Sequence, residues 1–353
     1  MNRRQDQSGG EGFRSEPEAP LRSRRQTGLA GLALGMSLSL SLAGCVETPP
    51  SNTQAVAATP APVPSETPTS TPDTLEPPEI IEPTELVGLN GEYFATKPTW
   101  VENYSSYPDG AFRDVSWNHV IDAAPANNEA QDYTDRIENL RIENDALVLL
   151  GRGTAAEGYT SARIDTKGRE DFMYGKFEIS AKIPNGVGSW PAIWLLPTDE
   201  VYTNQHSDTN FNCYCVDGEM DILEAIGSQQ NVIYGIAHAL KSPTNADYLS
   251  GYYNTITIPD ADTEFHTYGL EWTPTNLTFS VDNQVYYTVS KDPSWDFKRW
   301  PYDQRYHVVV NLALGGNWAG RDAQTYPPYG IDDSKLPSSL QLQSIKYYPY
   351  VPR

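Results

Sequence analysis

The pattern of apolar and polar residues changes near residue 86. From there to residue 353, short alternating or β-branched runs recur between turn signals such as Pro-Thr-Asn, Asp-Asn and Pro-Asn-Gly. Such runs are typical of strands with one buried face. They are LRIENDALVLLG, YGKFEISAKIP, NVIYGIAHAL, HTYGLEWTP, LTFSVDNQVYYTV, YHVVVNLAL and LQSIKYYPYV. No long stretch has helical periodicity with caps, so the pattern predicts an all-β antiparallel sandwich, closer to a jelly roll than to a barrel of alternating helices.

The N-terminal region has the residue pattern of an export signal rather than that of a folded domain. In residues 1–45, arginines at 22, 24 and 25 precede the run LAGLALGMSLSLSLAGC, which is too short and too rich in small residues for a comfortable membrane span. The run ends Leu-Ala-Gly-Cys, which resembles the bacterial lipoprotein cleavage box. The resemblance implies cleavage before Cys45 and acylation of its thiol. An ordinary signal peptide with an incidental cysteine is the alternative.

Residues 46–85 are rich in Pro, Thr, Ser, Ala and Glu and have almost no large apolar side chains. Such a segment cannot bury enough surface to offset its ordering entropy, so we expect an extended tether. An anchor followed by a tether predicts a domain at the bacterial cell envelope, outside the cytoplasm, with the lipid as its only membrane contact.

Composition narrows the class of partner. The formal net charge is -21, from 25 basic and 46 acidic side chains, and a chain this acidic repels a phosphate backbone. We therefore expect no nucleic-acid partner. The 22 Tyr and 8 Trp suit half-buried strands and also sugar-binding clefts. Three cysteines do not provide the four ligands of a structural zinc site.

Residues 218–224, GEMDILE, have the strongest chemical signal in the chain. Side chains alternate faces along a strand, so Glu219 and Asp221 point the same way, and Leu223 rather than Glu224 would follow them. One extra residue, a β-bulge, would return Glu224 to that face, and such bulges cluster beside active sites. The residues between the acids are apolar, which indicates a central, covered strand. The pattern predicts that three carboxylates line one wall of a cleft.

Three adjacent acids repel one another, which raises the pKa of at least one and keeps it protonated near neutral pH. Double-displacement glycoside hydrolysis needs such a mixture: an ionised nucleophile and a protonated general acid, roughly 5–5.5 Å apart in retaining enzymes. An acidic, solvated strand face is the other interpretation. The apolar residues between the acids favour the catalytic one.

The segment EMDILE resembles the ExDxxE signature of glycoside hydrolase family 16, in the bulged form of β-1,3-glucanases, agarases and carrageenases. Its neighbours match in order: NNEAQDYTDRIENLRIENDALVL, YTSARIDTKG, YGKFEISAKIPNGVGSWPAIWLLP, FHTYGLEWTP and VVVNLALGGNWAG are similar to laminarinase-type sequence. The resemblance covers roughly residues 95–350. It implies a concanavalin-like jelly roll with a concave substrate cleft.

By this resemblance Glu219 matches the nucleophile and Glu224 the acid/base. Asp221, between them, resembles the residue that hydrogen-bonds the nucleophile and tunes its charge. His238, on the next predicted strand, is placed like an active-site histidine, although a core or surface histidine is the alternative.

The resemblance also implies a set of substrate-binding residues. Trp190 and Trp194 match the two tryptophans of a WPAxW segment, whose indole faces stack on sugar rings; core packing is the alternative for Trp194. Arg163 and Asn128 match positions around the glycone subsites, and Trp318 matches a loop position beside the cleft. Each of these three could be merely structural.

Many relatives bind a structural calcium, and here that site departs from the pattern. Asn103 and Gln343 stand where carboxylates are expected. Loss of two charges weakens a hard-cation site. We therefore expect weak calcium binding or none, and no other metal or cofactor. Cys213 and Cys215 could pair only in a strained bridge, and two free thiols are as consistent with the sequence.

These observations predict a monomeric enzyme that acts on a polysaccharide by endo-acting, retaining hydrolysis of β-1,3 or mixed β-1,3/1,4 glucan. The first alternative is a hydrolase of a marine galactan such as agar, carrageenan or porphyran. The second is a non-catalytic glucan-binding protein on the same fold, which should have lost one glutamate. A transglycosylase shares the covalent intermediate, and the sequence does not separate it from a hydrolase.

Overall fold

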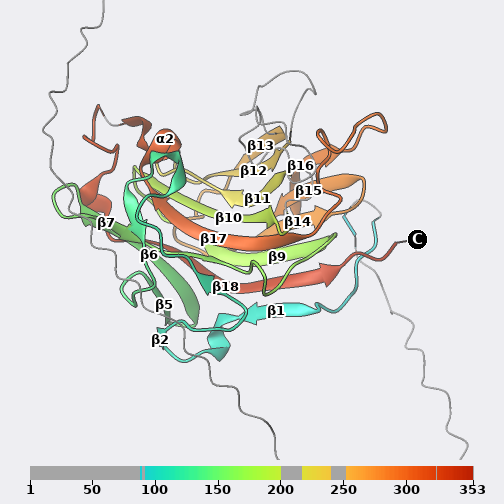
Figure 1. The fold of residues 1–353 in the computed structure, drawn as a ribbon, viewed down its shortest axis with the longest axis horizontal. Coiled ribbons are helices and arrows are strands. Elements are labelled where there is room, and N and C mark those ends of the chain that lie inside the picture. The colour runs from blue at the N-terminus through green and yellow to red at the C-terminus, as the bar shows by residue number, and fades with distance from the viewer. Residues whose placement is uncertain (1–87, 90–91, 200–216, 240–251, 323, 353) are drawn as a thin grey trace, which may run out of the picture. The chain divides into compact units, whose positions relative to one another are not determined.

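The computed structural model describes residues 88–89, 92–199, 217–239, 252–322 and 324–352, all within the compact unit Leu75–Arg353 (Figure 1). Two sheets contain all the strands of this part of the chain. Each strand pairs antiparallel to its neighbours, except that β4 runs parallel to β7. The predicted all-β antiparallel sandwich is confirmed.

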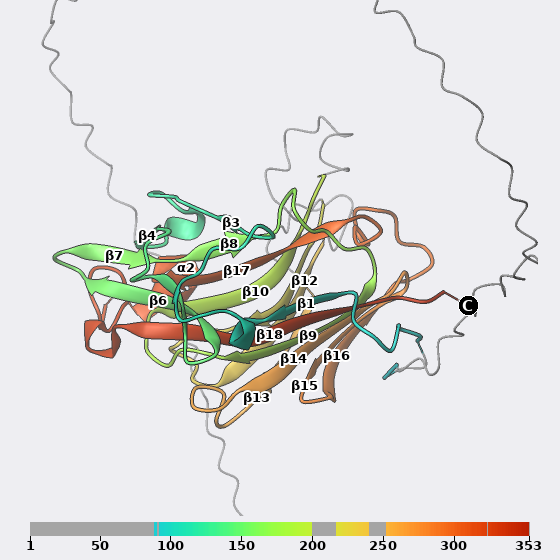
Figure 2. The same ribbon diagram turned by 90° about the horizontal axis from the view of Figure 1, so that it is seen from below.

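The first sheet has eleven strands, with β16-β15-β14-β9-β18-β6-β5-β2 as its main order, β1 beside β18, β7 beside β6 and β4 beside β7. The strands from β16 to β6 can be followed in Figure 2. Its strands are β1 (Trp100–Asn103), β2 (Gly110–Ala111), β4 (Gln131–Tyr133), β5 (Leu140–Glu143), β6 (Ala146–Thr154), β7 (Gly158–Ser161), β9 (Gly175–Lys182), β14 (His266–Trp272), β15 (Asn276–Val281), β16 (Gln284–Ser290) and β18 (Ser338–Pro349).

The second sheet has seven strands in the order β13-β12-β11-β10-β17-β8-β3. They are β3 (Asn118–His119), β8 (Arg163–Asp165), β10 (Ser189–Pro197), β11 (Glu219–Glu224), β12 (Val232–His238), β13 (Tyr252–Thr257) and β17 (Tyr306–Leu314). The helices of the described residues are single turns: η1 (Tyr104–Ser106), η2 (Ala126–Asn128), α2 (Gly316–Ala319), η4 (Gly320–Asp322) and η5 (Asp333–Lys335).

Every predicted alternating run forms a strand or a hairpin. Two hairpins turn on residue pairs with positive φ, Asn144-Asp145 and Asp282-Asn283, which tolerate that conformation better than most side chains do. The register of β5 and β6 is uniform beyond the turn, whereas that of β15 and β16 shifts by one residue between Phe279 and Ser280. The Asp-Asn signal therefore gave the β15–β16 connection correctly.

One hydrophobic core lies between the two sheets. Leu195, Met220 and Val310 of the second sheet share it with Phe177 and Ile345 of the first, and all of them are fully buried. Strand β11 is central, because β10 and β12 flank it. The apolar residues between the acids thus hold β11 in the core and turn its acids to the opposite face.

Candidate active site

A β-bulge in β11 brings its acids to one face. Asp221 lies opposite Ile236 of β12 and Glu224 lies opposite Tyr234, so three steps along β11 match two along β12. The pairing with β10 shifts at the same place, between Asp221 and Leu223. The extra residue reverses the alternation and returns Glu224 to the face of Asp221. The bulge expected from the sequence is present.

Strand register defines the face of the second sheet turned away from the core, called here the catalytic face. Residues directly opposite on paired strands point to the same side. In sheet order from β12 to β8, the members of this face used below are Tyr234, His238, Glu219, Asp221, Glu224, Trp190, Trp194, Asn311 and Arg163. Long-range pairing therefore collects most of the predicted site residues on one surface.

His238 lies opposite Glu219 and contacts two of the three acids. Its Nε2 is 3.1 Å from Asp221 Oδ2 and 3.6 Å from Glu219 Oε1. The Asp221 side chain is only 2% exposed, whereas those of Glu219 and His238 keep 20% and 28% of their surface. Asp221 is thus the buried partner of an ion pair, and Glu219 is accessible to a ligand.

Burial and mutual repulsion shift the protonation of this cluster. Burial, the Asp221 carboxyl and its hydrogen bond raise the pKa of Glu219 from 4.5 to about 8, against the opposing charges of His238 and Arg163. Burial and Asp221 also raise the pKa of Glu224 well above its usual value. Burial alone would lower the pKa of His238, but Glu219 and Asp221 raise it to about 10. At neutral pH the cluster therefore holds an imidazolium and at least one protonated carboxyl.

Trp190 and Trp194 both lie half-buried on the catalytic face, four residues apart on β10. Trp190 Nε1 donates to Glu224 Oε1 at 2.7 Å. Trp194 Nε1 donates to Asn311 Oδ1 at 2.8 Å, which fixes the plane of the indole. Trp194 does not pack into the core, so the structural interpretation of this residue is wrong.

Arg163 lies across the sheet on β8 and places its guanidinium 5.1 Å from the centre of the Trp194 ring. Its buried Nε has no hydrogen-bond partner among the described side chains and backbone, so a donor is left for a ligand oxygen. Sequence reasoning missed Asn311, whose side chain accepts the hydrogen bond from Trp194, because the strand pattern YHVVVNLAL did not mark it as a site residue. An amide in the middle of an otherwise apolar stretch of a fully buried strand could have drawn attention to it.

Trp318 in α2 contacts the rings of two catalytic-face residues. Its ring is 5.5 Å from that of Trp190 and 5.0 Å from that of Tyr234, edge-on in both cases. Asn128 is exposed in η2, and its Nδ2 donates to Asn317 Oδ1 at 2.8 Å, so it lies beside the helix of Trp318 rather than beside the acids. Sequence reasoning also missed Tyr234, whose position depends on the bulge.

Glu219, Asp221 and His238 offer atoms within 4.8 Å of one another, a spacing compatible with a cation. The 3.1 Å contact already pairs His238 with Asp221, so we assign the cluster to proton chemistry. At the positions considered for calcium, Asn103 Oδ1 accepts from Ser105 Oγ at 2.9 Å and Gln343 Oε1 accepts from Ser180 Oγ at 3.0 Å. The expectation of weak calcium binding stays a prediction.

Several predicted features lie outside the described residues: the export signal of residues 1–45 with its acylation site at Cys45, the tether of residues 46–85, and Cys213 and Cys215. Among the residues that are described, no helix is long and apolar enough to cross a membrane.

Comparison with known proteins gives consistent matches. Residues 124–330 match the sequence profile of glycosyl hydrolases family 16. A beta-glucanase of Rhodothermus marinus is 35% identical over 260 residues, 70% of this chain and 83% of that protein. A glucan endo-1,3-beta-glucosidase of Cryptopygus antarcticus is 32% identical over 235 residues, 63% of this chain and 83% of that protein. The crystal structure of a laminarinase from Rhodothermus marinus aligns with a TM-score of 0.62 at 31% identity, covering 74% of this chain and 99% of that one.

Proposed function

The chain belongs to glycosyl hydrolases family 16, and from that membership we propose that it cuts β-1,3-glucan internally, by a double displacement that retains anomeric configuration. One observation supports the mechanism above all others. The bulge in β11 turns Glu219, Asp221 and Glu224 to one face, where His238 pairs with Asp221 and the indole of Trp190 bonds Glu224. A buried acidic cluster of this kind is costly unless its proton sharing is used.

The proposed roles follow from what each carboxyl contacts. His238 is 3.6 Å from Glu219 and favours its charged form, so Glu219 is the carboxyl suited to attack the anomeric carbon. Glu224 has no cationic contact as close among the described residues and holds its proton, which suits it to protonate the leaving oxygen. After the glycosyl–Glu219 ester forms, Glu224 is ionised and removes a proton from the incoming water. Asp221 holds the His238 imidazolium in place throughout.

The substrate-binding roles are proposals of the same kind. Trp190, Trp194 and Trp318 present large half-buried rings, which suit the C–H faces of an uncharged sugar chain. Arg163 has an unpaired buried donor for a hydroxyl, and Asn128 lies farther along, beside Trp318. A sulfated galactan would need several convergent cations, whereas the guanidinium groups of Arg163 and Arg321 lie over different rings, those of Trp194 and Trp318. The glucan interpretation is therefore favoured over the marine-galactan one.

We propose that the domain is attached to the cell envelope by acylated Cys45, with residues 46–85 as the tether and the catalytic domain outside the cytoplasm as a monomer. The support is the basic stretch, short apolar run and Leu-Ala-Gly-Cys ending of residues 1–45. No cofactor is needed for the proposed chemistry.

Substrate class is tested by reducing-end release from laminarin, mixed-linkage glucan, agarose and carrageenan with the purified chain. We expect rapid release from laminarin, in fragments of several sugars rather than single glucose units, because the enzyme is endo-acting. Release from a galactan alone would overturn the proposed specificity and keep the mechanism. No release from any of them by folded protein would favour the glucan-binding alternative.

Replacement of His238 by Gln is expected to move the acidic limb of the pH profile of kcat/KM to higher pH. The imidazolium opposes the rise in the pKa of Glu219, so removing it raises that pKa further, and the ionised nucleophile persists over a narrower range. We expect a shift of about one unit. Rates measured from pH 4 to 9 on laminarin provide the profile; a limb that is unmoved, or that moves to lower pH, would contradict the role of His238.

A further inference from the structure

Residues 300–306 lie against the start of β11 and the end of β12, beside the pair formed by Glu219 and His238. Tyr302 Oη donates to the backbone oxygen of His238 at 2.9 Å. Gln304 Nε2 donates to the backbone oxygen of Asp217 at 2.8 Å, and Tyr306 Oη donates to the same oxygen. One segment thus holds the backbone on both sides of the catalytic pair.

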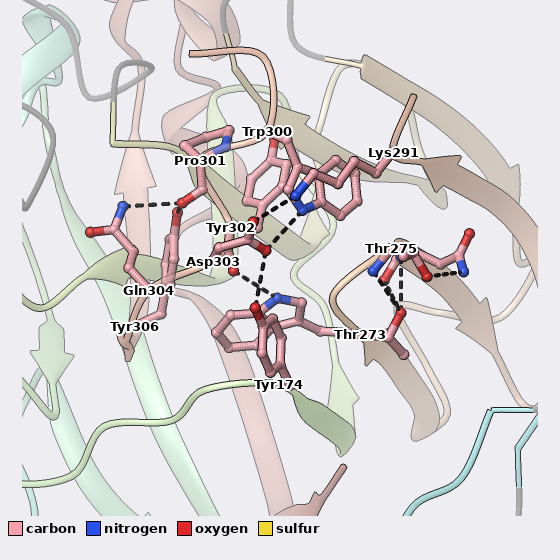
Figure 3. Close-up of polar contacts among 12 residues, drawn as sticks. Tyr174, Thr273, Thr275, Lys291, Trp300, Pro301, Tyr302, Asp303, Gln304 and Tyr306 are labelled. Atoms are coloured by element: carbon pink, nitrogen blue, oxygen red, sulfur yellow. Dashed lines mark hydrogen bonds and ion pairs between the residues drawn. The ribbon is translucent and has the colours of Figure 1, made fainter. Parts of the chain in front are cut away.

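The segment is itself fixed through Asp303 (Figure 3). In the figure, side chains from three directions converge on this carboxylate. Asp303 Oδ1 accepts from Tyr174 Oη at 3.0 Å and from Trp300 Nε1 at 3.1 Å, and Oδ2 accepts from Lys291 Nζ at 2.7 Å. Asp303 therefore ties the loop before β17 to its neighbours, because both of its oxygens accept hydrogen bonds.

The hydrogen bonds from Tyr302, Gln304 and Tyr306 to the backbone are largely shielded from water. Tyr302 and Tyr306 are 0% exposed, and Gln304 and Asp217 are 6% and 2% exposed. The contacts to the Asp217 oxygen are buried and the contact to the His238 oxygen is partly buried, so water replaces a lost donor poorly and the backbone must move or remain unsatisfied. The phenols and the amide therefore restrict where the two strands can lie.

Gly218 shows how closely the support approaches the catalytic strand. It lies between Asp217 and Glu219 with φ +81°, a conformation that favours glycine. A Cβ on this residue would lie 2.6 Å from Pro301 Cγ and 2.6 Å from Tyr306 Oη. The start of β11 is thus packed directly against the supporting segment, with no space for a side chain.

We propose that Tyr302 is a positioning residue for the hydrolysis, holding His238 against Glu219 and Asp221, and that Gln304 and Tyr306 do the same for Glu219 through the Asp217 backbone. Each of the three acts through a backbone oxygen, that of His238 for Tyr302 and that of Asp217 for Gln304 and Tyr306. The inference rests on the proposed roles of Glu219 and His238.

Through the His238 backbone, Tyr302 controls the distances between the imidazole and the two carboxyls. The distances from His238 Nε2, 3.1 Å to Asp221 and 3.6 Å to Glu219, set how strongly the imidazolium favours the ionised nucleophile. The other titratable or charged groups acting on the His238–Glu219 pair or on Tyr302 are Glu224 from β11, Arg163 from β8, Tyr252 from β13, Tyr287 from β16 and Tyr306 from β17. A substitution that deletes only the Tyr302 hydroxyl removes none of these groups.

The test is Tyr302→Phe in the full chain, which deletes one hydroxyl and keeps the ring. We expect kcat on laminarin to fall about tenfold with KM within about twofold, because the substrate-binding face is untouched. We also expect the acidic limb of kcat/KM to move to higher pH, since a less constrained imidazolium favours ionised Glu219 less. Wild-type kcat and an unmoved limb in folded Tyr302→Phe would overturn the proposal.

Tyr174→Phe is the matched control, because it removes a hydroxyl from the Asp303 contacts of the same segment but none from β11 or β12. We expect it to lower Tm and leave the pH profile unchanged; a limb shifted as far as that of Tyr302→Phe would mean that general destabilisation is the cause. If Tyr302→Phe does not fold, Gln304→Met replaces it with the same expectations. Failure of the proposed function is distinguished separately, since an active Glu219→Gln variant would refute the nucleophile whatever Tyr302 does.

Discussion

Glu219→Gln is expected to lower kcat on laminarin by about 10⁴-fold or more, which corresponds to roughly 5.5 kcal/mol of transition-state stabilisation. Gln has nearly the same volume and keeps an oxygen towards His238, but its amide cannot form the covalent glycosyl intermediate. Initial rates on laminarin, with circular dichroism to establish folding, measure the effect. A variant that retains wild-type turnover would end the proposed mechanism.

The same substitution is expected to leave Tm unchanged or to raise it. The folded pKa of Glu219 lies above its unfolded value, so the folded state binds more protons and stability from this group falls as pH rises from about 4.5 towards 8. An amide removes that penalty at neutral pH. A loss of both activity and Tm would indicate a structural role instead.

Glu178→Gln is a matched control on the opposite sheet. Burial raises the pKa of Glu178, but hydrogen bonds from Lys176 and Tyr348 and the charge of Lys176 outweigh it, so the pKa is lowered. The sign is reversed: the ionised carboxylate contributes stability above its unfolded pKa, and that contribution is lost as pH falls. We expect wild-type activity and a slightly lower Tm at neutral pH. The pair of variants separates loss of a carboxylate from loss of the nucleophile.

Local pattern was sufficient to predict the strands and the bulge. Alternation fixed which side chains of EMDILE share a face, and one extra residue was the only way to bring Glu224 to the side of Glu219 and Asp221. The apolar residues between them indicated a central strand, and β11 lies between β10 and β12. These features depend on neighbours within a few residues, which is why the sequence alone could give them.

The rest of the site depends on pairing between distant segments. Trp194 meets Asn311 and Arg163 because β10, β17 and β8 are adjacent, and no local pattern gives that order. Tyr234 joins the catalytic face through its register with Glu224. The support given by Tyr302 has no signature either, since a buried tyrosine before a strand resembles any core residue. Strand order and register across a sandwich are set by the whole core.

Glu224→Gln is expected to reduce kcat on laminarin by about 10³-fold, within the range for loss of a general acid. The amide oxygen still accepts the Trp190 N–H, so the side chain keeps its place but has no proton to give the leaving oxygen. A substrate with an activated aryl leaving group needs little protonation, so its first step should be spared. Hydrolysis of the glycosyl–enzyme then limits the rate, because no base activates water.

Azide distinguishes the two glutamates, because it attacks without needing a base. With Glu224→Gln and an activated aryl glucoside, we expect added azide to accelerate turnover and to give a β-glycosyl azide, since attack on the covalent intermediate is the second inversion. With Glu219→Gln no such intermediate forms, so any azide product should be the α-anomer, made by direct displacement. An α-azide from Glu224→Gln, or a β-azide from Glu219→Gln, would mean that Glu224 is the nucleophile and Glu219 the acid/base. The site is least compatible with that result, because His238 contacts Glu219 rather than Glu224.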